Sequence, residues 1–232
     1  MNLVDHIKTE ASAIILRITY GYSIEPLKAD PLTRLIERMT QGASLASVPL
    51  AWPVDILPIL EYFPERLPGM SFKKKFAREW NEITRMVIET PYKFVQQQME
   101  EGTHRLSYVS SLIEQHDDGG GENGRLNEDS ENAIERTAAV MYAGGGDTTV
   151  SSINSLVLAM VLFPAVQKKA QQEIDTVVGA NRLPSHGDRD NLPYVKALVE
   201  ETIRWSPVVP MGMAHKVDED INYAGLHISK RT

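Results

Sequence analysis

The chain has 232 residues, of which 42% are hydrophobic and 24% are charged, an ordinary composition for a globular protein. Its formal net charge of −7 argues against a nucleic-acid-binding protein, because neutralising phosphates requires clustered lysine and arginine. The sequence has no cysteine, which excludes disulfides, thiolate metal sites and cysteine nucleophiles among these residues.

Residues 1–116 show hydrophobic side chains at helical spacing on both sides of a proline-rich stretch. This stretch has prolines at positions 49, 53, 58, 64 and 68. Proline removes a backbone donor and clashes with the preceding helical turn, so short helices and turns are expected there. Pro91 is a candidate for a kink in the long helix that follows the stretch. The helices predicted in this part are Leu3–Tyr20, Pro31 to about Ala43, about Ser71 to Gly102, and Ser107–Gln115.

Residues 117–129 separate this part from the next. Most of the segment is polar, and residues 117–127 include four glycines, so a flexible surface loop is expected. Residues 130–207 again show helical patterning, with prolines at points where a helix must start or stop. The predicted elements are helices from about Ser130 to Phe163, from Ala165 to Val178 and from Pro193 to the residue before Ser206, with a loop over Pro184–Asn191.

Residues 208–232 turn to an extended pattern. Ile221–Tyr223 and Leu226–Ile228 flank Ala224-Gly225, which predicts a hairpin and the start of a small sheet. The chain is therefore expected to be mainly α and to form a single domain over residues 1–232. Its central helix should be long, and its β hairpin should lie near the C-terminus.

A run of three glycines, Gly144 to Gly146, interrupts the middle of the predicted central helix. Each interior glycine costs about 1 kcal/mol relative to alanine, so another interaction should offset the loss. Helical geometry places small residues and the hydroxyl of Thr148 along one stripe. Two interpretations remain open: a flat surface for a broad planar ligand, or close packing against another helix.

Glu201 and Arg204 lie three residues apart and share one side of a predicted helix. Such a pair is usually an exposed ion pair. Here Trp205-Ser206-Pro207 ends the helix at once, so the pair is expected near a buried junction. The six histidines show no metal-ligand spacing.

The segment Tyr142–Thr149 resembles the oxygen-activation segment of the central helix in the cytochrome P450 family, written [AG]-G-x-[DE]-T-[TS]. Glu201 and Arg204 match the family's E-x-x-R, and Leu192–Val195 precedes them at the family's distance. The order and spacing of these motifs are more specific than any one of them. In the first half, residues resembling the fungal branch are Val54-Asp55, Pro58, Tyr62, Pro64, Pro68-Gly69 and Phe72.

The resemblance implies a partial cytochrome P450 fold and a monooxygenase that uses haem b to activate O2. Oxygen would be inserted into an apolar small molecule of secondary or xenobiotic metabolism. NADPH-cytochrome P450 reductase would be the redox partner, at the cytosolic face of the endoplasmic reticulum membrane. Within residues 1–116, the proline-rich stretch and the helix after Ser71 would form the access lid.

The resemblance also assigns roles to single residues. The implied catalytic residues are Asp147 and Thr148, and the implied structural pair is Glu201 and Arg204. The implied cofactor-binding residues are Gly144, Gly145, Thr149 and His215. The implied substrate-binding residues are Ala138, Met141, Val208, Val209 and Met211.

The family's membrane anchor and its haem-ligating cysteine loop have no counterpart among these residues, so the chain is expected to be an internal piece of a longer P450. Without cysteine, it is expected to lack thiolate-ligated haem when isolated. Its longest apolar run, Leu156–Phe163, is far shorter than the roughly 20 residues of a membrane span. The alternative is a truncated, non-enzymatic helical protein that does not bind haem.

Overall fold

The first helix, α1 (Leu3–Tyr20), has the bounds that the sequence predicts. Asn2 caps its start, because the Asn2 side chain accepts a hydrogen bond from the Asp5 amide while Asp5 accepts one from the Asn2 amide. Gly21 ends the helix with φ of 66°, a left-handed conformation that glycine adopts without steric cost.

This computed structural model describes residues 2–25, 30–46, 48, 50, 52, 56–62, 71–117, 127–212 and 215–231.

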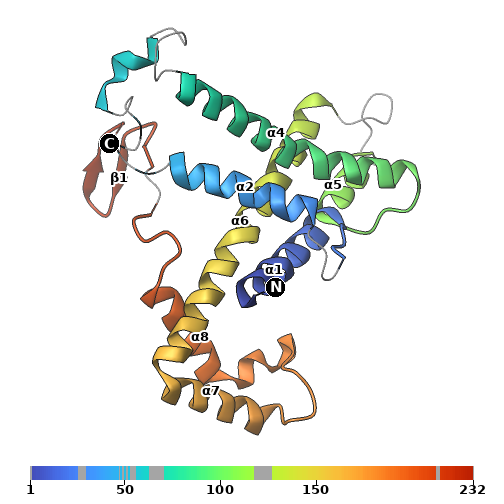
Figure 1. Cartoon of the computed structure of the whole chain (residues 1–232), viewed down its shortest axis with the longest axis vertical. Helices are drawn as coiled ribbons and strands as arrows, with labels where there is room; N and C mark the ends of the chain where they lie inside the picture. The colour runs from blue at the N-terminus through green and yellow to red at the C-terminus, as the bar shows by residue number, and fades with distance from the viewer. Residues whose placement is uncertain are drawn as a thin grey trace. The chain divides into compact units, whose positions relative to one another are not determined.

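The helices α2 (Pro31–Ala46), α4 (Ser71–Glu100) and α5 (Tyr108–Asp117) complete the first part of the chain (Figure 1). They agree with the predicted helices to within a few residues, and α4 continues through Pro91. In the proline-rich stretch, the structure describes a short 3₁₀ helix, η1 (Pro58–Tyr62), and much of the rest lies outside the described residues. The predicted loop over 117–129 likewise falls mostly outside them, and Asp117 belongs to α5.

The long central helix is α6 (Glu128–Leu162), a continuous element of 35 residues that includes the glycine run. The Asn127 side chain accepts a hydrogen bond from the Ser130 amide, and three acidic residues occupy the first turn, where the helix dipole favours negative charge. Pro164 follows its end at Leu162, as predicted.

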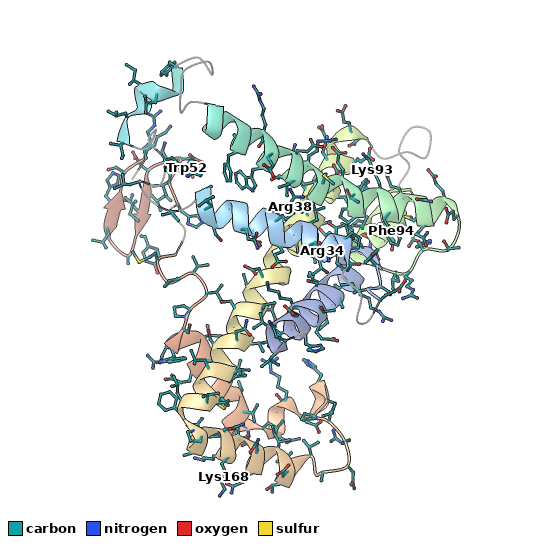
Figure 2. The ribbon with its side chains drawn as sticks, in the orientation of Figure 1. Arg34, Arg38, Trp52, Lys93, Phe94 and Lys168 are labelled. Atoms are coloured by element: carbon teal, nitrogen blue, oxygen red, sulfur yellow. The ribbon has the colours of Figure 1, made fainter. Side chains whose placement is uncertain are left out.

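The chain divides into two compact units, Met1–Ile153 and Asn154–Thr232, and α6 contributes to both. The first unit has a hydrophobic core in which Tyr142 of α6 is fully buried. Its hydroxyl donates a hydrogen bond to the Leu32 carbonyl of α2, and its ring meets Tyr20 edge-on. On the neighbouring side, Phe94 of α4, labelled in Figure 2, packs edge-on against Tyr22. The buried core residues are Leu16, Tyr20, Leu32, Leu35, Ile36, Ile83, Val87, Tyr92, Val95, Val109, Ile134, Ala138 and Tyr142.

The second unit packs α7 (Pro164–Val177) against α8 (Pro193–Trp205). Each helix has proline in its first turn, as the sequence predicts for Pro193, whereas α7 begins at Pro164, one residue before its predicted start at Ala165. The segment between them is not the plain loop expected over Pro184–Asn191, because its end forms a 3₁₀ helix, η2 (His186–Asn191). The physical reason is a capping box, in which Ser185 and Asp188 exchange hydrogen bonds and close a turn.

The predicted hairpin is confirmed: β1 (Ile221–Tyr223) pairs antiparallel with β2 (Leu226–Ile228). Ala224 and Gly225 form its turn, and both have positive φ. The described chain is thus mainly α with a small C-terminal sheet, which confirms the predicted fold class.

No single described helix is long and apolar enough to span a membrane. Taken together, α6 and α7 are long and apolar enough, but the pair is bent by 109° and qualifies by length and composition alone.

Candidate functional site

One face of α6 within the first unit is exposed along its length. Thr137, Val140, Gly144, Thr148 and Ser151 follow one another at intervals of three or four residues, and all are exposed. Asp147, also exposed, borders this stripe. The opposite side of the helix is buried in the core. The residue types along the exposed face are therefore small, hydroxylic or acidic, apart from Val140.

The three glycines of α6 differ in their surroundings. A Cβ atom added to Gly144 would meet no atom of the described residues within 4 Å, so the backbone there is open among them. A Cβ atom added to Gly145 would lie 2.7 Å from the side chain of Ile15 in α1, which is too close for any real contact. At Gly146 the nearest atoms belong to Ile36 of α2, at an ordinary 3.7 Å. The sequence left a ligand surface and helix packing open, and in this structure Gly145 takes part in helix packing whereas Gly144 is free for close approach.

The hydroxyl of Thr148 is held inside its own helix. It donates a hydrogen bond to the Gly144 carbonyl at 2.6 Å, and Ser152 in turn donates to the Thr148 carbonyl at 3.1 Å. Such bonds to the preceding turn fix the rotamer of a helical hydroxyl. The Thr148 oxygen retains its capacity to accept a further hydrogen bond. It is therefore an oriented hydroxyl next to the open backbone of Gly144.

Asp147 lies beside an ion pair that joins two other helices. Lys8 of α1 donates a hydrogen bond to Glu37 of α2, with 2.6 Å between Nζ and Oε1. The Lys8 side chain is 35% exposed and the Glu37 side chain is 41% exposed. The hydrogen bond to Glu37 raises the pKa of Lys8, and the negative charges of Glu37, Asp147 and Asp5 act in the same direction. A small pocket between α1, α2 and α6 is lined by Lys8, Glu37 and Asp147 among others.

The pair Glu201–Arg204 on α8 belongs to the second unit. Arg204 donates two hydrogen bonds to the Glu201 carboxylate, at 2.6 and 2.5 Å, in the forked geometry typical of strong pairs. These bonds lower the pKa of Glu201. Both side chains are more than half exposed in the described chain. Ser206 directly follows α8, and its hydroxyl accepts a hydrogen bond from the Ser155 hydroxyl of α6 at 3.0 Å. This bond ties the end of α8 to α6 within the same unit.

The other residues expected at the site are distributed over both units, and their roles stay predictions. In the first unit, Thr149 is exposed, Met141 is half-buried, and Ala138 is fully buried in the core. The second-unit residues Val208, Val209, Met211 and His215 are exposed, Met211 to 94%.

Sequence reasoning did not identify Lys8 and Glu37 as neighbours of Asp147. They come from two other helices, and no local motif links positions so far apart. Among the residues that the structure describes, no group of three histidine, aspartate or glutamate side chains could hold a metal ion.

Comparison with known proteins gives a consistent result. The sequence model of the family described as cytochrome P450 matches residues 1–232. The chain is similar to "Cytochrome P450 monooxygenase CLM2" of Gibberella zeae, with 57% identity over 229 residues, covering 99% of this chain and 43% of that protein. It is also similar to "Multifunctional cytochrome P450 monooxygenase af510" of Aspergillus fumigatus, with 48% identity over 95% of this chain and 41% of that protein. The chain thus spans about two-fifths of the length of these curated relatives.

Proposed function

The chain belongs to the cytochrome P450 family, and from this premise we propose that the whole protein is a haem-dependent monooxygenase acting on an apolar small molecule. The observation that carries the proposal is the exposed face of α6, where open backbone at Gly144 adjoins the oriented hydroxyl of Thr148 and the carboxylate of Asp147. The non-enzymatic alternative is not favoured, because the relatives that match nearly the whole chain are monooxygenases by name.

The residues of α6 fit a broad planar cofactor such as haem. No atom of the part of the chain that the structure describes lies within 4 Å of a Cβ position at Gly144, which leaves room for a flat group to approach the backbone closely. These 232 residues contain no cysteine, so they cannot supply a thiolate ligand to the haem iron. When bound, haem supplies the oxidative chemistry, and the protein supplies binding, orientation and protons.

Thr148 is the residue best placed to orient a group bound at the open face. Its own proton is directed to the Gly144 carbonyl, so its oxygen is free to accept a hydrogen bond from a protonated group or a water. Asp147 immediately precedes Thr148 in the sequence, and its carboxylate is a group that can act in proton transfer. Together these two side chains would hold and move a proton at the exposed face.

The remaining assignments complete the proposal. Glu201 and Arg204 would brace the core of the whole protein rather than take part in chemistry. Gly144, Thr149 and His215 would contact the cofactor or its surroundings, and Met141 and the turn Val208–Met211 would contact substrate. Gly145 packs against Ile15 and Ala138 is buried in the core, so these two would serve the packing of α6. NADPH-cytochrome P450 reductase would supply electrons at the endoplasmic reticulum membrane, and the haem would be haem b.

The test is to express the whole protein with a fungal NADPH-cytochrome P450 reductase and measure the carbon monoxide difference spectrum. Incorporation of isotopically labelled O2 into apolar substrates is measured in parallel. We expect a thiolate-type spectrum and one labelled oxygen atom in each product molecule. A whole protein that takes up no haem would overturn the proposal. The 232-residue chain alone should give no thiolate-type absorption, because it has no cysteine.

A further inference from the structure

A small polar pocket lies between α6 and the helices α1 and α2, at the edge of the exposed face where Asp147 stands. All three elements belong to the first unit. The space available to the centre of a water-sized sphere is about 20 Å³. About 10–15 Å³ of such volume is enough for one water molecule, so the pocket is large enough for one. The lining residues are Lys8, Ser12, Thr33, Ile36, Glu37, Thr40, Gly146 and Asp147.

One hydroxyl at this pocket has no partner. The Oγ1 atom of Thr33 is buried and makes no hydrogen bond to any residue that the structure describes, although the Thr33 backbone amide donates to Asp30. The neighbouring hydroxyl of Thr40 differs, because it donates to the Ile36 and Glu37 carbonyls. A buried hydroxyl without a partner is destabilising and is rare in folded proteins, which usually satisfy it with an ordered water.

The pocket also offers the several polar partners that a buried water needs. Lys8, Glu37 and Asp147 all line the pocket, and Lys8 and Glu37 form an ion pair. The charge of Asp147 acts on Lys8, which places the carboxylate within electrostatic range of the pair. Ammonium, carboxylate and hydroxyl groups together provide both donors and acceptors.

We propose that this pocket binds one ordered water molecule, held by the Thr33 hydroxyl, which connects the Lys8–Glu37 ion pair to the carboxylate of Asp147. The water serves both the stability of the fold and the candidate site. It satisfies the buried Thr33 hydroxyl, and it keeps the side of Asp147 that faces α1 and α2 hydrogen-bonded. Lys8 is thereby a positioning residue for Asp147. This last role rests on the proposed function, whereas the water site does not.

The water site is tested by replacing Thr33 with valine, which has the same shape but no hydroxyl, in the whole protein. If water is bound, Thr33→Val removes one of its partners and lowers the melting temperature by about 1–3 °C. If the pocket is dry, the same change removes an unsatisfied hydroxyl and leaves the melting temperature unchanged or higher, which would overturn the proposal.

The matched control is Thr137→Val on α6. Its hydroxyl donates to the Ala133 carbonyl at 2.6 Å and is exposed, so water replaces the lost bond and little change is expected. A crystal structure of the whole protein that resolves ordered waters gives the direct answer. A water within hydrogen-bond distance of Thr33 Oγ1 supports the proposal, and an empty pocket contradicts it.

The positioning role of Lys8 is tested by Lys8→Met, which removes the cation and keeps the aliphatic stem, and by Lys8→Arg, which keeps the charge. We expect Lys8→Met to cause a several-fold loss of product formed per NADPH consumed with KM unchanged, and Lys8→Arg to restore most of it. The control is Lys93→Met, which breaks a pair of similar length with Glu89, 2.7 Å, within α4 (Lys93 is labelled in Figure 2).

An unchanged product yield in Lys8→Met, or an equal loss in Lys93→Met, contradicts the positioning role. A wild-type protein that oxidises nothing would instead defeat the proposed function. The Thr33 measurements do not depend on oxidation, so they would still decide whether the water site exists.

Discussion

Gly145 of α6 and Ile15 of α1 are packed so closely that a Cβ atom on Gly145 would lie 2.7 Å from Ile15 Cγ1 and 2.8 Å from its Cδ1. One residue earlier, a Cβ atom on Gly144 would have no neighbour within 4 Å among the described residues. A helix turns by about 100° per residue, so adjacent glycines on it serve different surroundings. The two positions form a matched pair for separating packing from cofactor approach.

Gly145→Ala should lower the free energy of unfolding, and Gly144→Ala should not. Overpacking costs about 1–3 kcal/mol, which exceeds the gain of about 1 kcal/mol from replacing a helical glycine. At Gly144 only the gain remains, so its alanine variant should be as stable as the wild type or more so. Denaturant unfolding of the same protein in both variants measures the difference. Equal stabilities would mean that Ile15 moves aside without cost.

Thr148→Ala in the whole protein should leave haem content and substrate affinity intact while lowering the product formed per NADPH and raising the peroxide released. The reason is loss of the hydroxyl that is oriented by the Gly144 carbonyl. Thr137→Ala is the control, because that hydroxyl has the same bond to the preceding turn and the same exposure. If both variants keep the wild-type yield, Thr148 is an ordinary helical residue.

Glu173→Ala should loosen the start of α8. The Glu173 carboxylate accepts hydrogen bonds from the amides of Tyr194 at 2.9 Å and Val195 at 2.8 Å, and so caps this helix from α7. Loss of such a charged cap costs roughly 1–2 kcal/mol. Amide hydrogen exchange at Tyr194 and Val195 should accelerate in the variant. Asp175→Ala, on an exposed position of the same helix, should leave both rates unchanged.

Asp188 should keep its negative charge at unusually low pH. Two hydrogen bonds from Arg182, at 2.7 Å each, and bonds from Ser185 hold the pKa of Asp188 far below its usual range. A lowered pKa means that this carboxylate stabilises the folded state above its unfolded pKa of about 3.9, and that the contribution is lost as pH falls below that value.

Arg182→Gln removes the first of these causes, so the titration of Asp188 should move up towards its ordinary pKa. An NMR titration of the Asp188 carboxyl group in both proteins measures this shift. A titration that does not move would show that the Ser185 bonds alone hold the charge, contrary to this expectation.

Much of the secondary structure could be predicted because its signals act within one turn. Gly21 ends α1 and Pro193 begins α8 at the positions that the sequence indicates, and α7 begins within one residue of its predicted start. Proline fixes φ and glycine tolerates positive φ, and neither effect depends on distant residues. At His186–Asn191 the prediction was wrong, because the polar composition indicated a loop. The hydrogen bonds between Ser185 and Asp188 instead close a turn there and form η2.

The candidate site shows the other limit. The sequence alone determined that α6 carries small residues, an acid and a hydroxyl on one stripe, because helical periodicity is a local property of the chain. Only the tertiary structure decided that Gly145 faces Ile15 while Gly144 is open, and that Lys8 and Glu37 meet beside Asp147. These relationships depend on how α1 and α2 pack against α6, which is set by the burial of side chains far apart in sequence. No local pattern records it.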